Sequence, residues 1–185
     1  MDLKSKIILI SGPTASGKSK AALKIAKKLN GEIINADSMQ VYTELMTLTA
    51  RPSKTDLNKI DHHLYGFKSV KKEFSSGEWL KLAKKNIKKI RDKNKIPVLV
   101  GGTGLYFKAL TDGLVKIPKI PISVRDKIRR MQNKLGQKKF YLKLLNNDPL
   151  VRNKIDPTDV QRSIRAYEVI KFTKKSVFSL SLIHI

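Results

Sequence analysis

The sequence predicts an α/β fold in which a doubly wound parallel sheet is followed by a basic helical module. Apolar segments of strand composition alternate with amphipathic helical segments before residue 114. A glycine-rich turn follows the first of these strands, and regular strand–helix alternation is typical of parallel sheets. We therefore expect a P-loop NTPase-like core over residues 1–114, a partial helical module over 115–175 and an uncharacteristic tail over 176–185.

The first predicted strand leads into a complete phosphate-loop motif, G-x-x-x-x-G-K-[ST]. The apolar run 7–10 precedes it, and residues 22–29 continue with apolar side chains at helical spacing. Glycines let successive N–H groups point at one anion, and the helix N-terminus adds partial positive charge. Lys18 is expected to reach the outer phosphates, and Ser19 to offer its hydroxyl to a bound Mg²⁺. The predicted pyrophosphate-binding residues are Gly12, Pro13, Thr14, Ala15, Ser16, Gly17, Lys18 and Ser19.

The charge of the chain indicates a polyanionic partner. Its 185 residues contain 39 Lys and Arg against 15 Asp and Glu, a formal net charge of +24. Such an excess is typical of nucleic-acid-binding proteins. The alternative is coding bias, because lysines greatly outnumber arginines. Cysteine is absent, which excludes disulfides and thiolate metal sites.

The hydrophobic content of 41% supports a packed core and argues against wholesale disorder. The apolar run before the phosphate loop is too short for a signal peptide or a membrane span. We therefore expect a cytoplasmic monomer with no membrane partner.

The second strand and the central helix of the core have clear local signals. A strand over 31–35 ends in the polar cluster 37–40, and a short strand candidate lies at 64–67. Ser75 and Glu78 have the spacing of a capping box. The helix that follows turns its apolar residues inward, namely Trp79, Leu80, Ala83, Ile87 and Ile90. Its opposite face carries lysines, which we interpret as a solvated surface.

The last predicted strand of the core, 96–100, is followed by the turn G-G-T-G at 101–104. The phosphate loop, the cluster at Asp37 and the turn at Thr103 each come directly after a strand. In an open parallel sheet, ligands bind at the carboxyl ends of the strands. We therefore expect these three segments to converge on one cleft.

Beyond residue 114 the chain changes character. Residues 115–121 contain two prolines and are interpreted as a connector, and the chain from Ser123 is helical and very basic. Asp148-Pro149 and Asp156-Pro157 are expected to mark the starts of later helices. The tail has neither a cap nor an amphipathic helical pattern.

Asp37 has three possible roles from its residue type and position. It could be a second Mg²⁺ ligand, a general base or a helix N-cap. The adjacent residues include a hydroxyl, an amide and an aromatic ring. Amides pair with the adenine edge, and aromatic rings stack on unpaired bases. A carboxylate in such company is well placed to accept a proton from the exocyclic amine of adenine.

Five separated motifs resemble bacterial tRNA dimethylallyltransferases, over residues 6 to about 173. They are the phosphate loop, D-S-M-Q-V-Y at 37–42, T-A-R-P at 49–52, G-G-T-G-L-Y at 101–106 and D-V-Q-R-S-I-R-A-Y-E-V at 159–169. The resemblance implies that the loop holds the pyrophosphate of dimethylallyl diphosphate, without ATP. It also implies that the acceptor is the adenosine immediately 3′ of the anticodon in tRNA.

The same resemblance assigns roles to individual residues. It implies that Asp37 is the general base and that Thr103 meets the reacting centre, with Lys18 at the leaving group. It further implies a set of tRNA contacts, namely Asp37, Ser38, Met39, Gln40, Thr103, Arg125, Gln161, Arg162, Ser163, Ile164 and Arg165. Without the resemblance, Thr103 could be a simple N-cap, and Arg125 and Arg165 could be solvated surface. His62 and His63 have no metal-ligand pattern, and we assign them no role.

Two other functions stay open from the sequence. A nucleoside or nucleotide kinase would use the same loop for ATP, although no arginine-rich lid is evident. The chain could also be an inactive fragment that binds RNA or pyrophosphate. Members of the family usually continue well beyond the length seen here, so we expect a truncated or chimeric form of a longer gene.

Overall fold

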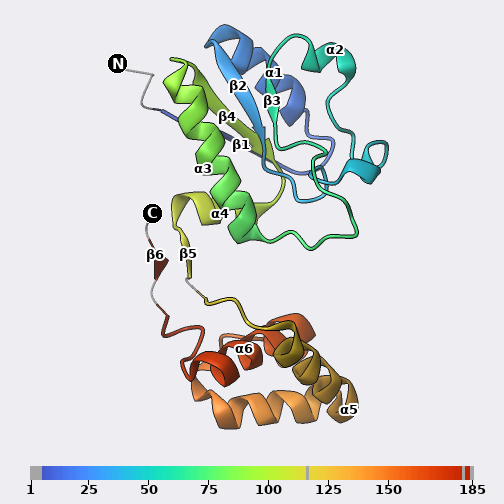
Figure 1. Ribbon diagram of the computed structural model, residues 1–185, viewed down its shortest axis with the longest axis vertical. Coiled ribbons are helices and arrows are strands. Elements are labelled where there is room, and N and C mark those ends of the chain that lie inside the picture. Colours follow the sequence, from blue (N-terminus) through green and yellow to red (C-terminus); the bar gives the residue numbers. More distant parts are fainter. Residues whose placement is uncertain (1–5, 116, 181, 184–185) are drawn as a thin grey trace. The chain divides into compact units, whose positions relative to one another are not determined.

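The computed structural model describes residues 6–115, 117–180 and 182–183, and the chain divides into two compact units, Met1–Asp112 and Gly113–Ile185 (Figure 1). Within the described residues, the first unit holds a four-stranded sheet with the order β1-β4-β2-β3. Every pair of neighbouring strands in this sheet is parallel. The predicted α/β fold class is therefore confirmed. The strands are β1 (Ile8–Ser11), β2 (Gly31–Asn35), β3 (His62–His63) and β4 (Ile96–Gly101).

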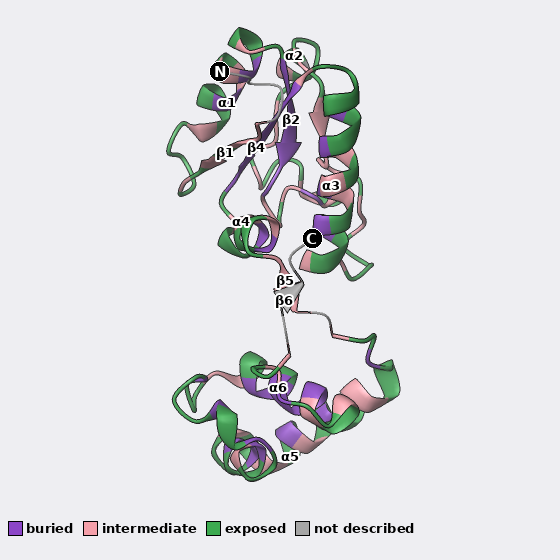
Figure 2. Ribbon diagram, turned by 90° about the vertical axis from the view of Figure 1, so that its left-hand side faces the viewer, coloured by how far each residue is buried: buried purple, intermediate pink, exposed green. Residues whose placement is uncertain are grey.

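Helices α1 (Lys18–Lys28) and α3 (Ser76–Asp92) lie on opposite faces of this sheet (Figure 2). On the α1 side, Ala22 and Ala26 pack with the buried β-branched residues Ile33, Val98 and Val100. Because side chains alternate along a strand, the neighbouring buried residues of β2 and β4 face the α3 side.

The start of α3 agrees with the sequence prediction. Ser75 Oγ accepts from Glu78 N at 3.2 Å, and the Glu78 carboxylate accepts from Ser75 N at 3.0 Å, which completes the capping box. The inward face is also as predicted: the buried residues of α3 are Trp79, Leu80, Ala83, Ile87 and Ile90.

The strand expected at 64–67 is wrong. The strand in this region is β3, which pairs His62 with Ile33 and His63 with Ile34. Leu64 and Gly66 follow it with positive φ angles of 64° and 52°, so the chain turns where a strand was expected. The short elements nearby are η1 (Thr43–Leu45), α2 (Lys54–Leu57) and α4 (Gly104–Thr111).

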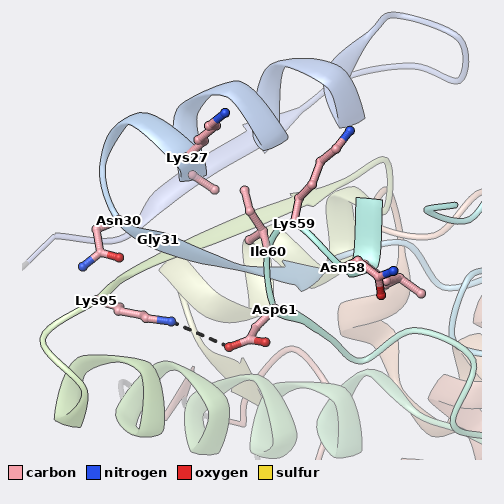
Figure 3. A pocket seen from close by; sticks show the side chains of 10 residues that line it. Lys27, Asn30, Gly31, Asn58, Lys59, Ile60, Asp61 and Lys95 are labelled. Atoms are coloured by element: carbon pink, nitrogen blue, oxygen red, sulfur yellow. Dashed lines mark ion pairs between the residues drawn. The ribbon is translucent and has the colours of Figure 1, made fainter. Parts of the chain in front are cut away.

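A buried carboxylate joins a partly exposed ion cluster where the strands of the sheet begin. Glu32 is fully buried, and its carboxylate lies 3.0 Å from Lys93 Nζ, 2.8 Å from Lys95 Nζ and 2.7 Å from His63 Nε2. Lys95 Nζ also lies 3.7 Å from Asp61 Oδ2, and both residues line a pocket of about 310 Å³ (Figure 3). This pocket is at the edge of the sheet opposite to the turns that follow the strands. The cluster gives His63 a structural contact that its sequence context did not indicate.

The Glu32 cluster predicts acid-sensitive stability. Burial alone would raise the pKa of Glu32, but hydrogen bonds from Lys95, His63 and Lys93 outweigh it and lower the pKa from 4.5 to about 2. The stabilisation is therefore complete above pH 4.5 and is lost as the pH falls toward 2. We expect Glu32→Gln to lower the free energy of unfolding at pH 7 by about 1–3 kcal/mol, because the lysines lose their partner. Urea titrations of the parent chain and of Glu32→Gln at pH 7 and pH 3 measure the difference between their free energies of unfolding. We expect a smaller difference at pH 3. An equal difference at the two pH values would contradict the role of the carboxylate.

The second unit is built around α5 (Ile122–Asn147), η2 (Pro149–Val151) and α6 (Val160–Thr173). Its core packs Phe140, Tyr141 and Leu144 against Ile164 and Tyr167. α5 is kinked at Gly136, where φ is 72° and ψ is 163°. The predicted helical module and the helical start at Pro149 are both observed.

Two details of the second unit differ from the sequence prediction. The helix expected at Asp156-Pro157 begins later, at Val160. Asp156 accepts a hydrogen bond from Thr158 N in a turn. Asp159 caps the helix by accepting from Arg162 N at 2.9 Å. The expected tail also packs in part: Ser176 is buried, and Val177 lies against the helical core. Residues 181, 184 and 185 of that tail lie outside the described residues.

A short antiparallel pair joins β5 (Leu114–Val115) to β6 (Leu182–Ile183). Among the helices described, none is both long and apolar enough to cross a bilayer.

Candidate active site

The phosphate loop joins β1 to α1 and is largely exposed. Gly17 is the N-cap of α1 with a φ of 79°, and Ala15 also has a positive φ of 63°, so the loop turns sharply into the helix. Lys18 Nζ donates to the Pro13 carbonyl at 2.8 Å, which folds the side chain back across the loop. The first N–H groups of a helix have no acceptor within it and carry its positive dipole end. This arrangement can hold an anion.

Asp37 is fixed by the buried residue at the end of the preceding strand. Asn35 Oδ1 accepts from Asp37 N at 2.9 Å, and Asn35 Nδ2 donates to the carbonyls of Asp37 at 2.9 Å and Leu64 at 3.0 Å. Asp37 Oδ1 accepts from Met39 N at 2.9 Å, which closes a side-chain turn. No helix begins at Asp37, so the N-cap interpretation of this residue is wrong. Asn35 was not among the predicted site residues, although a polar residue at the end of an apolar strand is a usable signal.

The three turns that follow strands meet in space, as the sequence predicts. A Cβ built on Gly102 would lie 3.3 Å from the carbonyl oxygen of Gly12 and 3.9 Å from Asp37 Oδ2. A Cβ on the neighbouring Gly101 would overlap the backbone of Ala36. The glycines after β4 thus allow the first residue of the phosphate loop and the Asp37 carboxylate to approach the same backbone.

Thr103 links the turn after β4 to the turn after β2. Its Oγ1 accepts from Ser38 N at 2.9 Å and donates to Ser38 Oγ at 3.2 Å. Thr103 does occupy the N-cap position of α4, but its side chain makes no capping hydrogen bond. Its hydroxyl therefore fixes the residue next to Asp37 and does not cap the helix.

Met39 and Gln40 differ in how far they are available to a ligand. The Met39 side chain is 52% exposed. Gln40 Nε2 donates to the Thr49 carbonyl at 2.7 Å, so its amide supports the loop that carries the T-A-R-P motif. The expected pairing of this amide with adenine would have to replace that hydrogen bond.

Aromatic side chains surround the Asp37 turn. Tyr106 stacks on Trp79 with a centroid distance of 4.3 Å, and Trp79 Nε1 donates to the Asn35 carbonyl at 2.8 Å. Burial raises the pKa of Tyr106 to about 12, with smaller contributions from Tyr42 and Asp37. Burial and the Asp37 charge likewise raise the pKa of Tyr65. Both phenols are therefore neutral at physiological pH, and both interact electrostatically with the Asp37 carboxylate.

A small pocket of about 130 Å³ adjoins the phosphate loop at Ser19. Leu23, Ile33 and Val100 supply an apolar wall, whereas Arg51 and Asp56 add charged side chains to the lining. The rings of His62 and Tyr65, which contact each other edge to face, also line the pocket. Burial lowers the pKa of His62, which favours the neutral ring. The pocket therefore offers one apolar wall next to a residue of the phosphate loop.

The donor groups at the site suit a metal that is shared with a phosphate ligand. Within the described residues, no group of three His, Asp or Glu side chains could hold a metal ion. Ser19 is exposed in the first turn of α1. Mg²⁺ usually retains water and takes one or two protein ligands together with substrate phosphates. Ser19 fits that mode of binding, and an all-protein cage is not formed by these residues.

In the second unit, two predicted tRNA-contacting arginines meet at one buried carboxylate. Glu168 is 2% exposed, and its Oε2 lies 3.1 Å from Arg165 Nη1. Its Oε1 lies 3.7 Å from Arg125 Nε on α5. The Arg125 and Arg165 side chains are 28% and 47% exposed, and the Nε atom of Arg125 is buried.

The predicted stretch 161–165 splits between the surface and the interior of the second unit. Gln161, Arg162 and Arg165 are exposed. Ser163 and Ile164 are buried, and Ser163 Oγ accepts from Gln137 Nε2 at 3.1 Å. The side chains available to a partner along this stretch are therefore those of Gln161, Arg162 and Arg165.

Comparison with known proteins gives a consistent family. The family model described as IPP transferase matches residues 40–182. A tRNA dimethylallyltransferase from Pelagibacter ubique is 62% identical over 178 residues, covering 96% of this chain and 57% of the relative. A tRNA dimethylallyltransferase from Rickettsia massiliae is 49% identical over 173 residues, covering 94% of this chain and 48% of the relative.

A solved structure resembles this chain over most of its length. It is a eukaryotic dimethylallyltransferase described as acting on tRNA, and it superposes with a TM-score of 0.79 at 28% sequence identity. The match covers 95% of this chain and 45% of that structure. The chain thus spans about half the length of the relatives it matches.

Proposed function

This chain belongs to the IPP transferase family, and from that premise we propose that it transfers a dimethylallyl group from dimethylallyl diphosphate to tRNA. The acceptor is the exocyclic N6 amine of the adenosine immediately 3′ of the anticodon, and diphosphate is released. The observation that carries this proposal is the approach of Gly12 and Asp37 to the same glycine turn. A phosphate-binding loop and a carboxylate thereby border one reaction site. A tRNA acceptor also implies a cytoplasmic location.

In the proposed reaction, the allylic C–O bond of the donor breaks and a C–N bond to N6 forms. Negative charge develops on the leaving diphosphate, where the loop N–H groups and Lys18 can stabilise it. A Mg²⁺ ion held by Ser19 and the diphosphate would add Lewis-acid stabilisation of that leaving group. Asp37 accepts the proton that N6 loses, and this type of catalysis contributes about 10²–10⁴-fold.

The environment of Asp37 supports these roles. Asn35 and Thr103 hold the Asp37 turn through hydrogen bonds on both sides. We place the dimethylallyl group against the apolar wall of the pocket beside Ser19, because that pocket borders both the phosphate loop and Tyr65.

Incorporation of isotope-labelled dimethylallyl groups tests the proposal. The chain and the full-length Pelagibacter relative would each be incubated with labelled dimethylallyl diphosphate and a tRNA that has adenosine 3′ of the anticodon. Label in tRNA, abolished when that adenosine is replaced by guanosine, is the expected result. Phosphate transfer from ATP to a nucleoside without prenyl transfer would favour the kinase alternative. Binding without turnover by this chain, beside turnover by the relative, would favour the inactive-fragment alternative.

We further predict that Arg125 and Arg165 contribute to tRNA binding and not to donor binding. The double variant Arg125→Gln/Arg165→Gln should weaken tRNA binding and reduce its salt dependence, by about 0.7–0.9 in log–log slope for each phosphate that is no longer neutralised. Glutamine is preferred to glutamate because a new carboxylate beside Glu168 would destabilise the fold further. Because the double variant already leaves the buried Glu168 without these two cations, circular dichroism must first show that it is folded. Filter binding across a salt series provides the measurement, and affinity for dimethylallyl diphosphate should not change.

Lysines on α3 provide the matched control for this prediction. Lys85 and Lys88 are exposed, and their double replacement by glutamine removes the same charge. An equal decrease in tRNA affinity in the two double variants would mean that net charge, and not the helical unit, determines binding. A flat salt dependence of the parent chain would attribute the charge of +24 to coding bias.

A further inference from the structure

The carboxylate of Glu168 has no role in the proposed chemistry, yet it lies at a distinctive position. It is 2% exposed and lies within 4 Å of two guanidinium groups that come from different helices. A buried carboxylate is costly unless cations and hydrogen bonds compensate it. Similarly sized apolar residues often replace buried ion pairs without loss of stability. Stability alone is therefore a weak reason for an ionic group at this position.

The geometry restricts both arginines. Arg165 is on the same helix as Glu168, one turn earlier, and its Nη1 lies 3.1 Å from Glu168 Oε2. Arg125 approaches from α5, with its buried Nε 3.7 Å from the other carboxylate oxygen, which is an ion-pair contact and not a hydrogen bond. The two oxygens of one side chain thus face one arginine each. Long arginine side chains lose much rotamer freedom when they bind a ligand, unless the protein has already restricted them.

Charge at this cluster favours an anionic partner. Two guanidinium groups and one carboxylate leave a net positive charge, and both arginines keep exposed surface. A guanidinium has five N–H donors in a planar fork, so one carboxylate oxygen cannot satisfy all of them. Planar forks of this kind suit phosphate oxygens of a nucleic-acid backbone.

We propose that Glu168 is a positioning residue for RNA binding: it holds Arg125 and Arg165 as one preorganised pair that contacts backbone phosphates. This inference rests on the proposed function, because it takes tRNA as the ligand. Glu168 itself does not touch the RNA. It acts through the two arginines by reducing the ordering that RNA binding would otherwise require.

The test replaces Glu168 by glutamine in the full chain and measures binding to an anticodon stem-loop RNA. Removing a negative charge close to an RNA site should strengthen binding if charge alone matters. If Glu168 positions the arginines, the same substitution should weaken RNA binding. Each arginine that must be ordered on binding costs about 2- to 10-fold in affinity, so we expect Glu168→Gln to weaken binding by about 10-fold.

Asp126→Asn is the matched control, because Asp126 is exposed and adjacent to Arg125 on α5. It removes the same charge without removing the carboxylate that faces the arginines, and we expect unchanged or slightly tighter binding. If Glu168→Gln behaves like this control, the positioning role is overturned while tRNA binding stands. If the parent chain does not bind the stem-loop, both the positioning role and the tRNA part of the proposed function fail.

A double-mutant cycle separates positioning from folding. Added to Arg125→Gln/Arg165→Gln, the Glu168→Gln change removes a buried carboxylate that has lost these cations, so it should raise the melting temperature and cause no further decrease in RNA affinity. A further decrease in RNA affinity in that background would show that Glu168 does not act through the arginines, and would overturn the proposal. Glu168→Asp keeps the charge but shortens the side chain. It replaces Glu168→Gln in the RNA-binding measurement if the glutamine variant does not fold. We expect an intermediate decrease in affinity from Glu168→Asp, and parental affinity in that variant would overturn the proposal.

Discussion

Asp37→Asn is expected to lower turnover by about 10²-fold or more while leaving donor and tRNA binding intact. Asparagine has almost the same shape, and its side-chain oxygen can still accept the hydrogen bond from Met39 N that Asp37 accepts at 2.9 Å. The variant therefore preserves the turn and removes the proton acceptor. Single-turnover transfer of labelled dimethylallyl groups, with saturating donor and tRNA, isolates this effect from binding.

A second carboxylate of the first unit gives the control for Asp37. Asp92 is exposed at the end of α3, and Asp92→Asn removes the same charge away from the site. We expect parental turnover from this variant. Parental turnover in Asp37→Asn as well would limit Asp37 to a structural role in its turn. Weaker tRNA binding with an unchanged chemical step would indicate an acceptor contact in place of a general base.

The parts of the site that the sequence predicts are those set by local chemistry. A glycine with a positive φ angle before a helix and a serine–glutamate capping box are decided by neighbouring residues. The apolar face of α3 follows from helical periodicity, and each of its predicted inward residues is buried. Convergence of the three turns follows from the parallel sheet, because parallel strands end at the same edge.

The parts that the sequence does not predict depend on partners that are distant along the chain. Gln40 has the residue type for adenine recognition, but its amide nitrogen bonds the backbone at Thr49. Thr103 occupies the N-cap position of α4, yet its hydroxyl accepts a hydrogen bond from Ser38 N and makes no capping bond. Glu168 could not be linked to Arg125 by spacing, because they belong to different helices. In each case a tertiary contact competes with the local one and is the one formed.

Lys18→Ala is expected to abolish measurable diphosphate binding. Lys18 Nζ donates to the exposed Pro13 carbonyl at 2.8 Å, so its removal should have little effect on folding. The same ammonium group is the side-chain cation of the motif that reaches the outer phosphates. Isothermal titration with inorganic pyrophosphate and with dimethylallyl diphosphate measures the effect without requiring turnover. A change of only a few-fold in either dissociation constant would contradict the assignment of the leaving group to this loop.

Lys20→Ala distinguishes a specific phosphate contact from the general positive field of this chain. Lys20 lies two residues further along α1 and is exposed, so its replacement removes the same charge from the same helix. Exposed charges are screened by salt over about 10 Å at 0.1 M, and this variant should therefore retain nearly parental affinity. A charge held against the bound diphosphate is screened much less, so the effect of Lys18→Ala should persist as salt is raised. If both variants bind equally weakly and both defects vanish at high salt, the diphosphate is attracted by the basic surface, and the phosphate loop is not its binding site.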